Sequence, residues 1–118
     1  MRAFFYLRGC EKCMQIMKTL NLDSAIKQID IKKNSLNEYQ LDELFKLSKK
    51  YEALFSKRAQ LYKQRGLKDK ALNDEDYRML ILEHYTFLKR PLLVYDQAIY
   101  IGNSSKVVEA AKAFLNEQ

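Results

Sequence analysis

The sequence predicts an α/β fold in which a helical segment interrupts a mixed sheet of about four strands. Three features of the chain predict this arrangement. Residues 2–31 have the pattern of strand, helix and strand, residues 32–90 hold no convincing strand, and residues 91–118 return to a strand pair and a helix. The chain has 118 residues, 47% of them hydrophobic, so we expect one domain with one sizeable core.

The first part of the chain predicts two strands joined by a helix. Arg2–Leu7 is a short apolar run rich in β-forming residues, and Glu11–Leu20 repeats its apolar residues at helical spacing. Ala25–Ile31 alternates in character, with Ile29 and Ile31 on one face. The short crossover through the helix favours parallel pairing of the two strands.

The middle of the chain predicts helices only. Ser35-Leu36-Asn37-Glu38 has the pattern of a capping box, in which Ser35 caps a helix and Glu38 bonds back to it. Asn73 precedes three acidic residues, a combination that is typical of a helix N-terminus. We therefore expect residues 35–87 to form a helical insert.

The last part of the chain predicts a β-hairpin and a final helix. Leu92–Tyr95 and Ala98–Ile101 are apolar runs on either side of the two-residue turn Asp96-Gln97. Ser104 or Ser105 is placed to cap the helix that follows.

The predicted element order is βαβ, helical insert, ββα, which is the order of a thioredoxin-like fold with an insertion. Residues 1–34 and 88–118 would form the thioredoxin-like part, and residues 35–87 the insert. Pro91 is the only proline and opens a strand that should lie inside the sheet, an awkward place for a residue without an N–H. In this fold a cis proline stands there and faces the cysteines, so we predict a cis Arg90–Pro91 bond that shapes the substrate groove.

The only two cysteines, Cys10 and Cys13, stand where the first predicted strand meets the first predicted helix. A helix N-terminus has unpaired N–H groups and a partial positive charge, so it would stabilise a thiolate on Cys10. Arg8 and Lys12 add positive charge, and Glu11 opposes it. We predict a redox pair in which Cys10 is the nucleophile and Cys13, one turn along, is the resolving thiol.

Two other interpretations of the cysteine pair stay open. The cysteines could be small buried hydrophobes, although Gly9 and the flanking charges favour exposure. A zinc site needs four ligands, and the chain offers only His84 besides the two cysteines. We therefore expect no metal unless two subunits share one.

The net charge of +6 is unevenly spread along the chain. Residues 43–70 hold nine Lys and Arg against three acidic residues, and the remaining residues balance. This basic segment would attract an anion, an acidic protein or nucleic acid, or it would be a solvated helical face. No helix-turn-helix pattern or stacking platform accompanies it, so we expect no direct DNA binding.

No apolar run is long enough to span a membrane, and Arg8 interrupts the apolar start too early for a signal peptide. We therefore expect a cytoplasmic protein. Thiols are kept reduced in that compartment, which favours a catalytic or sensing pair over a structural disulfide. We also expect a monomer.

Four blocks of sequence, together with the helix predicted around Leu41 and Leu44, carry a family resemblance. They are the C-x-x-C after the first strand, Leu54–Arg58, Leu88–Val94 with its Arg90-Pro91 pair, and Ile101-Gly102. In this order they resemble the arsenate reductase (ArsC)/Spx family over nearly the whole chain. That family has the thioredoxin-like fold with a helical insert.

In the arsenate reductases of that family, a cysteine at the position of Cys10 attacks arsenate, and arginines at the positions of Arg58 and Arg90 help to hold the oxyanion. The resemblance implies the same roles for these three residues here. Guanidinium groups suit this task because they match tetrahedral oxyanions and stay charged. No bound cofactor is implied. Glutathione with glutaredoxin, or thioredoxin, would return the nucleophile to its thiol form.

At two places the sequence departs from the glutathione-coupled arsenate reductases and resembles the Spx branch of the family instead. Cys13-Met14 stands where the glutathione-coupled enzymes carry Ser-Arg, and Asn103-Ser104-Ser105 lacks their further arginine. In Spx-type proteins the disulfide state of a C-x-x-C controls binding to the C-terminal domain of the RNA polymerase α subunit. We therefore predict an ArsC-like thiol–disulfide oxidoreductase acting on a small oxyanion or a thiol or disulfide substrate. The alternative is an Spx-like redox-sensing regulator that turns nothing over.

Overall fold

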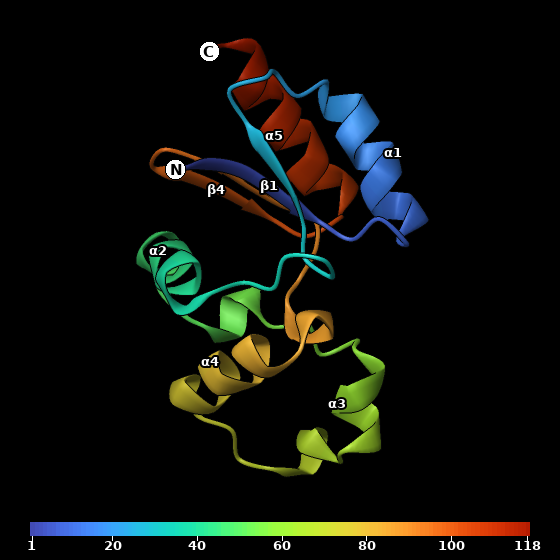
Figure 1. Cartoon of the computed structure of the whole chain (residues 1–118), viewed down its shortest axis with the longest axis vertical. Helices are drawn as coiled ribbons and strands as arrows, with labels where there is room; N and C mark the ends of the chain where they lie inside the picture. The colour runs from blue at the N-terminus through green and yellow to red at the C-terminus, as the bar shows by residue number, and fades with distance from the viewer. The chain divides into compact units, whose positions relative to one another are not determined.

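A computed structural model describes the whole chain, residues 1–118, and divides it into two compact units (Figure 1). The first unit comprises Met1–Asn34 and Arg90–Gln118, and the second comprises Ser35–Lys89. The insert predicted from sequence, residues 35–87, ends two residues before the second unit does. None of the helices combines the length and the apolar character that crossing a bilayer requires.

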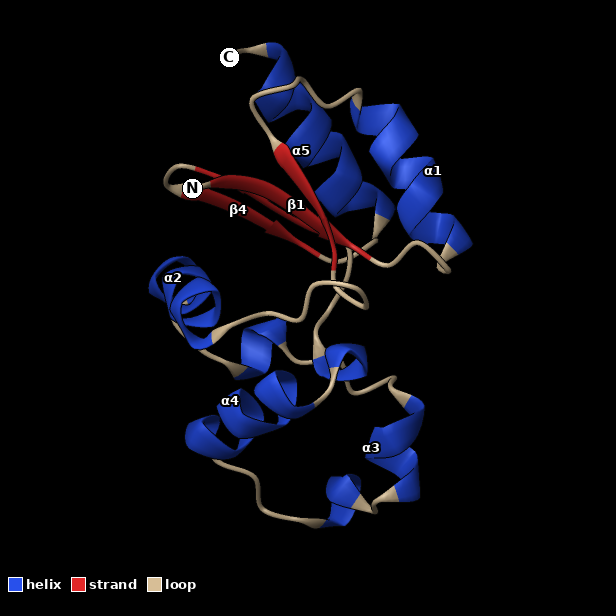
Figure 2. Cartoon of the chain, viewed as in Figure 1, coloured by secondary structure: helices blue, strands red, loops and turns tan.

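The first unit contains a mixed four-stranded sheet in the order β2-β1-β3-β4 (Figure 2). Strand β1 (Arg2–Tyr6) pairs in parallel with β2 (Lys27–Asp30) and antiparallel with β3 (Leu92–Tyr95). Strand β4 (Ala98–Ile101) completes the predicted hairpin by pairing antiparallel with β3. The α/β, thioredoxin-like architecture predicted from the sequence is therefore confirmed.

Helices α1 (Glu11–Leu20) and α5 (Ser105–Asn116) lie together on one face of the sheet (Figure 1). Both follow strands that run in the same direction, so both helices begin at the same end of the sheet. Alternate residues of each strand face these helices. The buried core on this face is Phe4, Tyr6, Cys13, Ile16, Leu20, Ile26, Leu93 and Ala111.

The second strand differs from its predicted pattern. Ile29, Asp30 and Ile31 are all buried, so the expected alternation of buried and exposed residues is wrong at Asp30. The reason is local: the strand ends at Asp30, and the N–H of Ile31 donates to the carbonyl of Tyr6 (2.9 Å). The Asp30 carboxylate is retained in the interior because it accepts the N–H of Lys32 (3.2 Å).

The second unit is helical, as predicted. Its helices are α2 (Glu38–Ser48), α3 (Gln60–Gln64) and α4 (Asp74–Glu83), with short 3-10 turns at η1 (Glu52–Leu54), η2 (Leu67–Asp69) and η3 (Tyr85–Phe87). Its only strand-like feature is a single antiparallel bridge between Phe55 and Leu88. The ring of Phe55 stacks on that of Phe87 at 5.2 Å and lies 4.8 Å from that of Tyr77, which builds an aromatic core.

The capping box of α2 lies two residues later than predicted. The N–H of Gln40 donates to Asn37 (2.7 Å), and the N–H of Asn37 donates to the Gln40 side chain (3.0 Å). The predicted Ser35–Glu38 box is therefore wrong. The shift makes Leu36 the residue before the cap and Leu41 the fourth helical residue, both buried, which are the positions of a hydrophobic staple.

Candidate active site

Cys10 is the N-cap of α1, at the end of the turn that leaves β1. Its N–H donates to the carbonyl of Leu7 (2.9 Å), and its Sγ accepts the N–H of Cys13 (3.4 Å). The side chain is half-buried. The sulfur therefore lies where the unpaired N–H groups and the dipole of α1 interact favourably with negative charge.

Cys13 has the opposite environment. Its side chain is fully buried, with 0% of its surface exposed. Burial raises the pKa of the Cys13 thiol to about 11, while a hydrogen bond with the backbone of Leu7 and the positive charge of Arg90 act in the other direction. Both cysteines are free thiols. The pair thus combines one accessible sulfur with one that is protected and protonated at neutral pH.

Pro91 and Arg90 lie at the same end of the sheet as the cysteines. The Arg90–Pro91 bond is cis, which confirms that prediction. Phe5, near the end of β1, pairs with Leu92 at the start of β3, so Pro91 is close to the exit of β1. Gly102 fixes the strand end by donating its N–H to the Pro91 carbonyl (2.9 Å), with a positive φ of 94° that glycine readily adopts.

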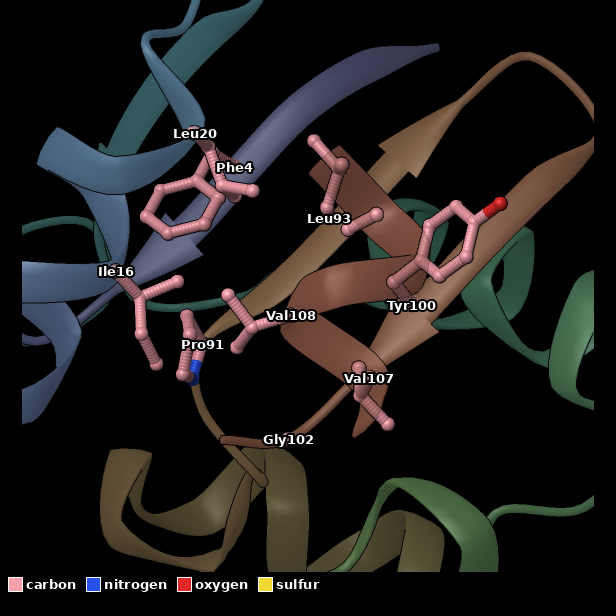
Figure 3. A pocket seen from close by; sticks show the side chains of 10 residues that line it. Phe4, Ile16, Leu20, Pro91, Leu93, Tyr100, Gly102, Val107 and Val108 are labelled. Atoms are coloured by element: carbon pink, nitrogen blue, oxygen red, sulfur yellow. The ribbon is translucent and has the colours of Figure 1, made fainter. Parts of the chain in front are cut away.

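A small cavity lies beside Pro91, between the sheet and the two helices of the first unit (Figure 3). Its volume of about 10 Å³ holds one water molecule at most. Figure 3 shows Pro91 close to Ile16 and Val108, and most of the lining is apolar, with Tyr100 the one residue that has a polar side-chain group. Neither cysteine lines this cavity, so it is a packing gap rather than a substrate site, and the groove-shaping role of Pro91 stays a prediction.

Arg58 belongs to the second unit, where it is exposed in the turn before α3. The structure therefore brings Cys10, Cys13, Arg90 and Pro91 together in the first unit, and the anion-binding role of Arg58 stays a prediction.

The basic segment that contains Arg58, residues 43–70, is partly neutralised. Three of its cations form ion pairs, which are Lys46 with Glu43, Lys57 with Glu52, and Arg65 with Glu83.

The structure contains no group of three or more His, Cys, Asp or Glu side chains that could hold a metal ion. His84, the third residue considered for zinc, lies in the second unit. Its Nδ1 accepts the N–H of Thr86 (3.1 Å), so it caps the η3 turn.

Sequence reasoning missed two exposed lysines at the end of the sheet that carries the dithiol. Lys32 and Lys33 follow β2, and the hydrogen bond from Ile31 to Tyr6 holds their loop next to the one that leads to Cys10. The predicted parallel pairing of the first two strands already indicated that these lysines would lie near the loop that leads to Cys10. Loops that follow adjacent parallel strands gather at one edge of a sheet, where α/β proteins place their sites.

Comparison with known proteins identifies the family. The ArsC family profile matches residues 6–111, so the chain belongs to the ArsC family. This confirms the resemblance carried by the four blocks of sequence. A search of curated proteins finds no match.

Several solved structures share the fold. An ArsC family related protein from Bacteroides fragilis has a TM-score of 0.78 at 21% identity, over 93% of this chain and 97% of that one. An arsenate reductase from Vibrio cholerae has a TM-score of 0.75 at 20% identity, over 93% of each chain. A possible arsenate reductase from Streptococcus mutans has a TM-score of 0.69 at 28% identity, over 89% of this chain and 92% of that one.

Proposed function

We propose that the protein is a thiol–disulfide oxidoreductase in which Cys10 is the nucleophile and Cys13 the resolving thiol. The observation that carries this proposal is the asymmetry of the pair. Cys10 is accessible and accepts a hydrogen bond from the N–H of Cys13 at the start of α1, whereas the Cys13 thiol is buried. An attacking thiolate needs access and a positive environment, and a resolving thiol needs only to reach the first sulfur.

The reaction has two exchange steps. The Cys10 thiolate attacks one sulfur of a substrate disulfide, which forms a mixed disulfide and releases the first substrate thiolate. Cys13 then loses its proton and attacks the Cys10 sulfur, which closes the Cys10–Cys13 disulfide and releases the second substrate thiolate. Two electrons pass from the protein to the substrate. The positive charge of Arg90 favours the thiolate of Cys13 in the second step.

A disulfide substrate suits the site better than arsenate. Several structural relatives are named arsenate reductases, and Arg58 and Arg90 would be the groups that hold the oxyanion here. However, the segment after β4 supplies no arginine, and the hydroxyl of Ser104 is used to cap α5 by accepting the N–H of Val107 (3.2 Å). Arsenate is therefore the second substrate to assay, after a disulfide.

The Cys10–Cys13 pair and the lack of an arginine after β4 also support a second candidate, an Spx-like redox-sensing regulator. It would use the Cys10–Cys13 disulfide as a switch for binding the C-terminal domain of the RNA polymerase α subunit. Repeated turnover with glutathione or thioredoxin as electron donor would support the enzyme. One stoichiometric oxidation that changes binding to the α subunit domain would support the regulator.

Reaction of the reduced protein with glutathione disulfide tests the assigned roles. Samples quenched with acid and analysed by mass spectrometry should show the Cys10–Cys13 disulfide in the parent protein. Cys13→Ser should accumulate a mixed disulfide on Cys10, and Cys10→Ser should stay unmodified. A Cys10→Ser variant that reacts as fast as the parent protein would overturn the proposal.

A further inference from the structure

The end of the sheet that carries Cys10 is formed by four segments that are far apart in the sequence. They are residues 7–12 after β1, 31–34 after β2, 90–91 before β3 and 102–106 after β4. The strand registers bring them together, because Tyr6 pairs with Asp30, Phe5 with Leu92, and Leu92 with Ile101. We call this surface the dithiol face.

Basic residues dominate the dithiol face. Five of its six cations are exposed and the sixth, Arg90, is half-buried. The six are Arg8, Lys12, Lys32, Lys33, Arg90 and Lys106. Because α1 and α5 both begin here, their N-terminal partial charges add to this positive field.

Little negative charge offsets these cations. Two carboxylates offset the six cations: Glu11 within the four segments and the neighbouring Asp30, which is buried and accepts the N–H of Lys32, so the cations remain in excess by four. The opposite end of the sheet has no such excess, since Arg2 is paired there with Asp96 (3.0 Å). The first unit is therefore polarised, with its positive end around the nucleophilic sulfur.

We infer that the dithiol face binds the acidic surface of a partner protein and presents that partner's disulfide to Cys10. This inference rests on the proposed function and names its substrate class. Neighbouring strands are about 4.8 Å apart, so the loops that follow β2 and β4 are separated by about 14 Å. One tetrahedral oxyanion or one small disulfide cannot bridge cations over that span, whereas a protein surface with several carboxylates can.

The surroundings of Cys10 also suit a protein partner. Met14 and Met17 are half-buried on α1 and, with Cys10, border the core of the first unit. Methionine side chains are flexible and polarisable, so they adapt to different partner surfaces. Met14 follows Cys10 by one helical turn, so an apolar side chain adjoins the sulfur on α1. Charged groups at the edge of a protein interface set its association rate.

The redox step with such a partner is the exchange described above. The Cys10 thiolate breaks the partner's disulfide and forms the mixed disulfide, and Cys13 then displaces the partner as a dithiol. The partner gains two electrons and two protons, and the protein keeps the Cys10–Cys13 disulfide. No further oxidant or reductant is needed for one round.

Three disulfide-bridged peptides of equal length test the charge preference. They differ only in flanking the cysteines with glutamate, glutamine or lysine. The measured quantity is the second-order rate constant for oxidation of the reduced full-length protein. We expect the glutamate peptide to react about tenfold faster than the lysine peptide at low ionic strength, and the difference to collapse at about 0.5 M salt.

A matched pair of charge reversals locates the effect. The double variant Lys32→Glu/Lys33→Glu should lose the preference for the glutamate peptide. The control Lys18→Glu/Lys112→Glu makes the same change in net charge at exposed positions outside the four segments and should retain it. Unchanged urea midpoints in both variants would show that the fold is intact, and reaction of the Lys18→Glu/Lys112→Glu control with glutathione disulfide at the parent rate would show that the charge change alone does not impair the dithiol.

Other outcomes separate this inference from the proposed function. Equal, salt-independent rates for all three peptides would overturn the acidic-partner inference and leave the oxidoreductase standing. No reaction with any peptide or with glutathione disulfide would overturn the proposed function. In that case, binding of the labelled glutamate peptide to the Cys10→Ser protein, measured by fluorescence anisotropy, still tests the surface. Tighter binding of a single-stranded oligonucleotide than of the glutamate peptide would overturn the assignment to a protein partner.

Discussion

At the scale of single residues, the chemistry depends on two cysteines that lie one helical turn apart in opposite environments. The sulfur of Cys10 accepts the N–H of Cys13, while the thiol of Cys13 points into the core of the first unit. Both positions follow from the helix that begins between them. The residue at the N-cap faces the turn outside the helix, and the residue three positions later starts the buried stripe.

The high pKa of Cys13 predicts how the resolving step depends on pH. Burial raises this pKa to about 11, so only a small fraction of Cys13 is thiolate at neutral pH. The rate of closing the Cys10–Cys13 disulfide should therefore rise about tenfold per pH unit between about pH 7 and pH 10. Rapid acid quenching of a preformed mixed disulfide on Cys10 measures this rate. A rate that does not change over this range would contradict a raised pKa of the Cys13 thiol.

Arg90 should act on the same step through its charge. Its positive charge lowers the pKa of Cys13, so Arg90→Gln should slow the resolving step several-fold at about pH 8 and shift its pH profile upward. Arg90→Lys keeps the charge and should stay close to the parent profile. If the Gln and Lys variants slow the step equally and leave the profile in place, Arg90 has only a structural role.

At the scale of elements, the sequence predicts the bounds of a helix well where its local signals agree, and poorly where two local signals compete. The bounds of α1 agree with prediction because its cap, its periodicity and its C-terminal Asn21 in the left-handed region all mark the same segment. The start of α2 was misplaced because Ser35–Glu38 and Asn37–Gln40 both have capping-box spacing. Burial of Leu36 favours the second, and burial is a tertiary property that the local pattern does not contain.

The capping box of α4 carries a testable share of the stability of the second unit. The side chain of Asn73 accepts the N–H of Asp76 (2.8 Å), and the Asp76 carboxylate accepts the N–H of Asn73 (2.9 Å). Asn73→Ala should lower the free energy of unfolding by about 1 kcal/mol in urea titrations. Asn103→Ala, at an exposed position with no such bond, is the control and should change it by less than about 0.5 kcal/mol. Equal effects of the two substitutions would mean that the box contributes nothing.

Helices α2 and α4 are joined by a polar contact that depends on pH. The guanidinium of Arg78 donates to both carboxylate oxygens of Asp42 (3.1 and 3.3 Å), and the Tyr51 hydroxyl donates to the same carboxylate (2.6 Å). These bonds, those from Arg78 first, hold the pKa of Asp42 below its usual value. The stabilisation is therefore present above the unfolded-state pKa and is lost as the pH falls through the lower folded-state value.

Substitution of Asp42 tests this contact. Asp42→Asn should lower the urea midpoint at pH 7, and the difference from the parent protein should shrink as the pH falls below about 3.9. Asp69→Asn, on the exposed η2 turn, removes the same charge and is the control. A difference between Asp42→Asn and the parent that persists unchanged at about pH 2 would show that charge on Asp42 is not what joins the helices.

At the scale of the whole molecule, the sequence predicts the total charge but not its distribution in space. The count along the chain puts the excess in residues 43–70, yet the first unit holds ten basic and six acidic residues and the second holds eleven and nine. Arg8, Lys32 and Lys106 become neighbours only through the order of the strands.

Stability should be as unevenly distributed as charge. Strands β1 and β3 occupy the centre of the sheet, bonded on both sides, and Phe4, Phe5, Leu92 and Leu93 are all at most 2% exposed. Helix α3 has only five residues, none of them buried, and no side chain caps its N-terminus. Amides that open only by global unfolding exchange far more slowly than those released by local fraying.

Native-state hydrogen exchange followed by NMR tests this distribution. Amides of β1 and β3 should show protection factors on the order of 10³-fold or more above those of α3, and their exchange should track the global free energy of unfolding as urea is added. The α3 amides should exchange with little dependence on urea, because their opening exposes little new surface. If α3 is protected as strongly as β1, then that short helix unfolds only together with the sheet, and its stability comes from contacts outside its own turn.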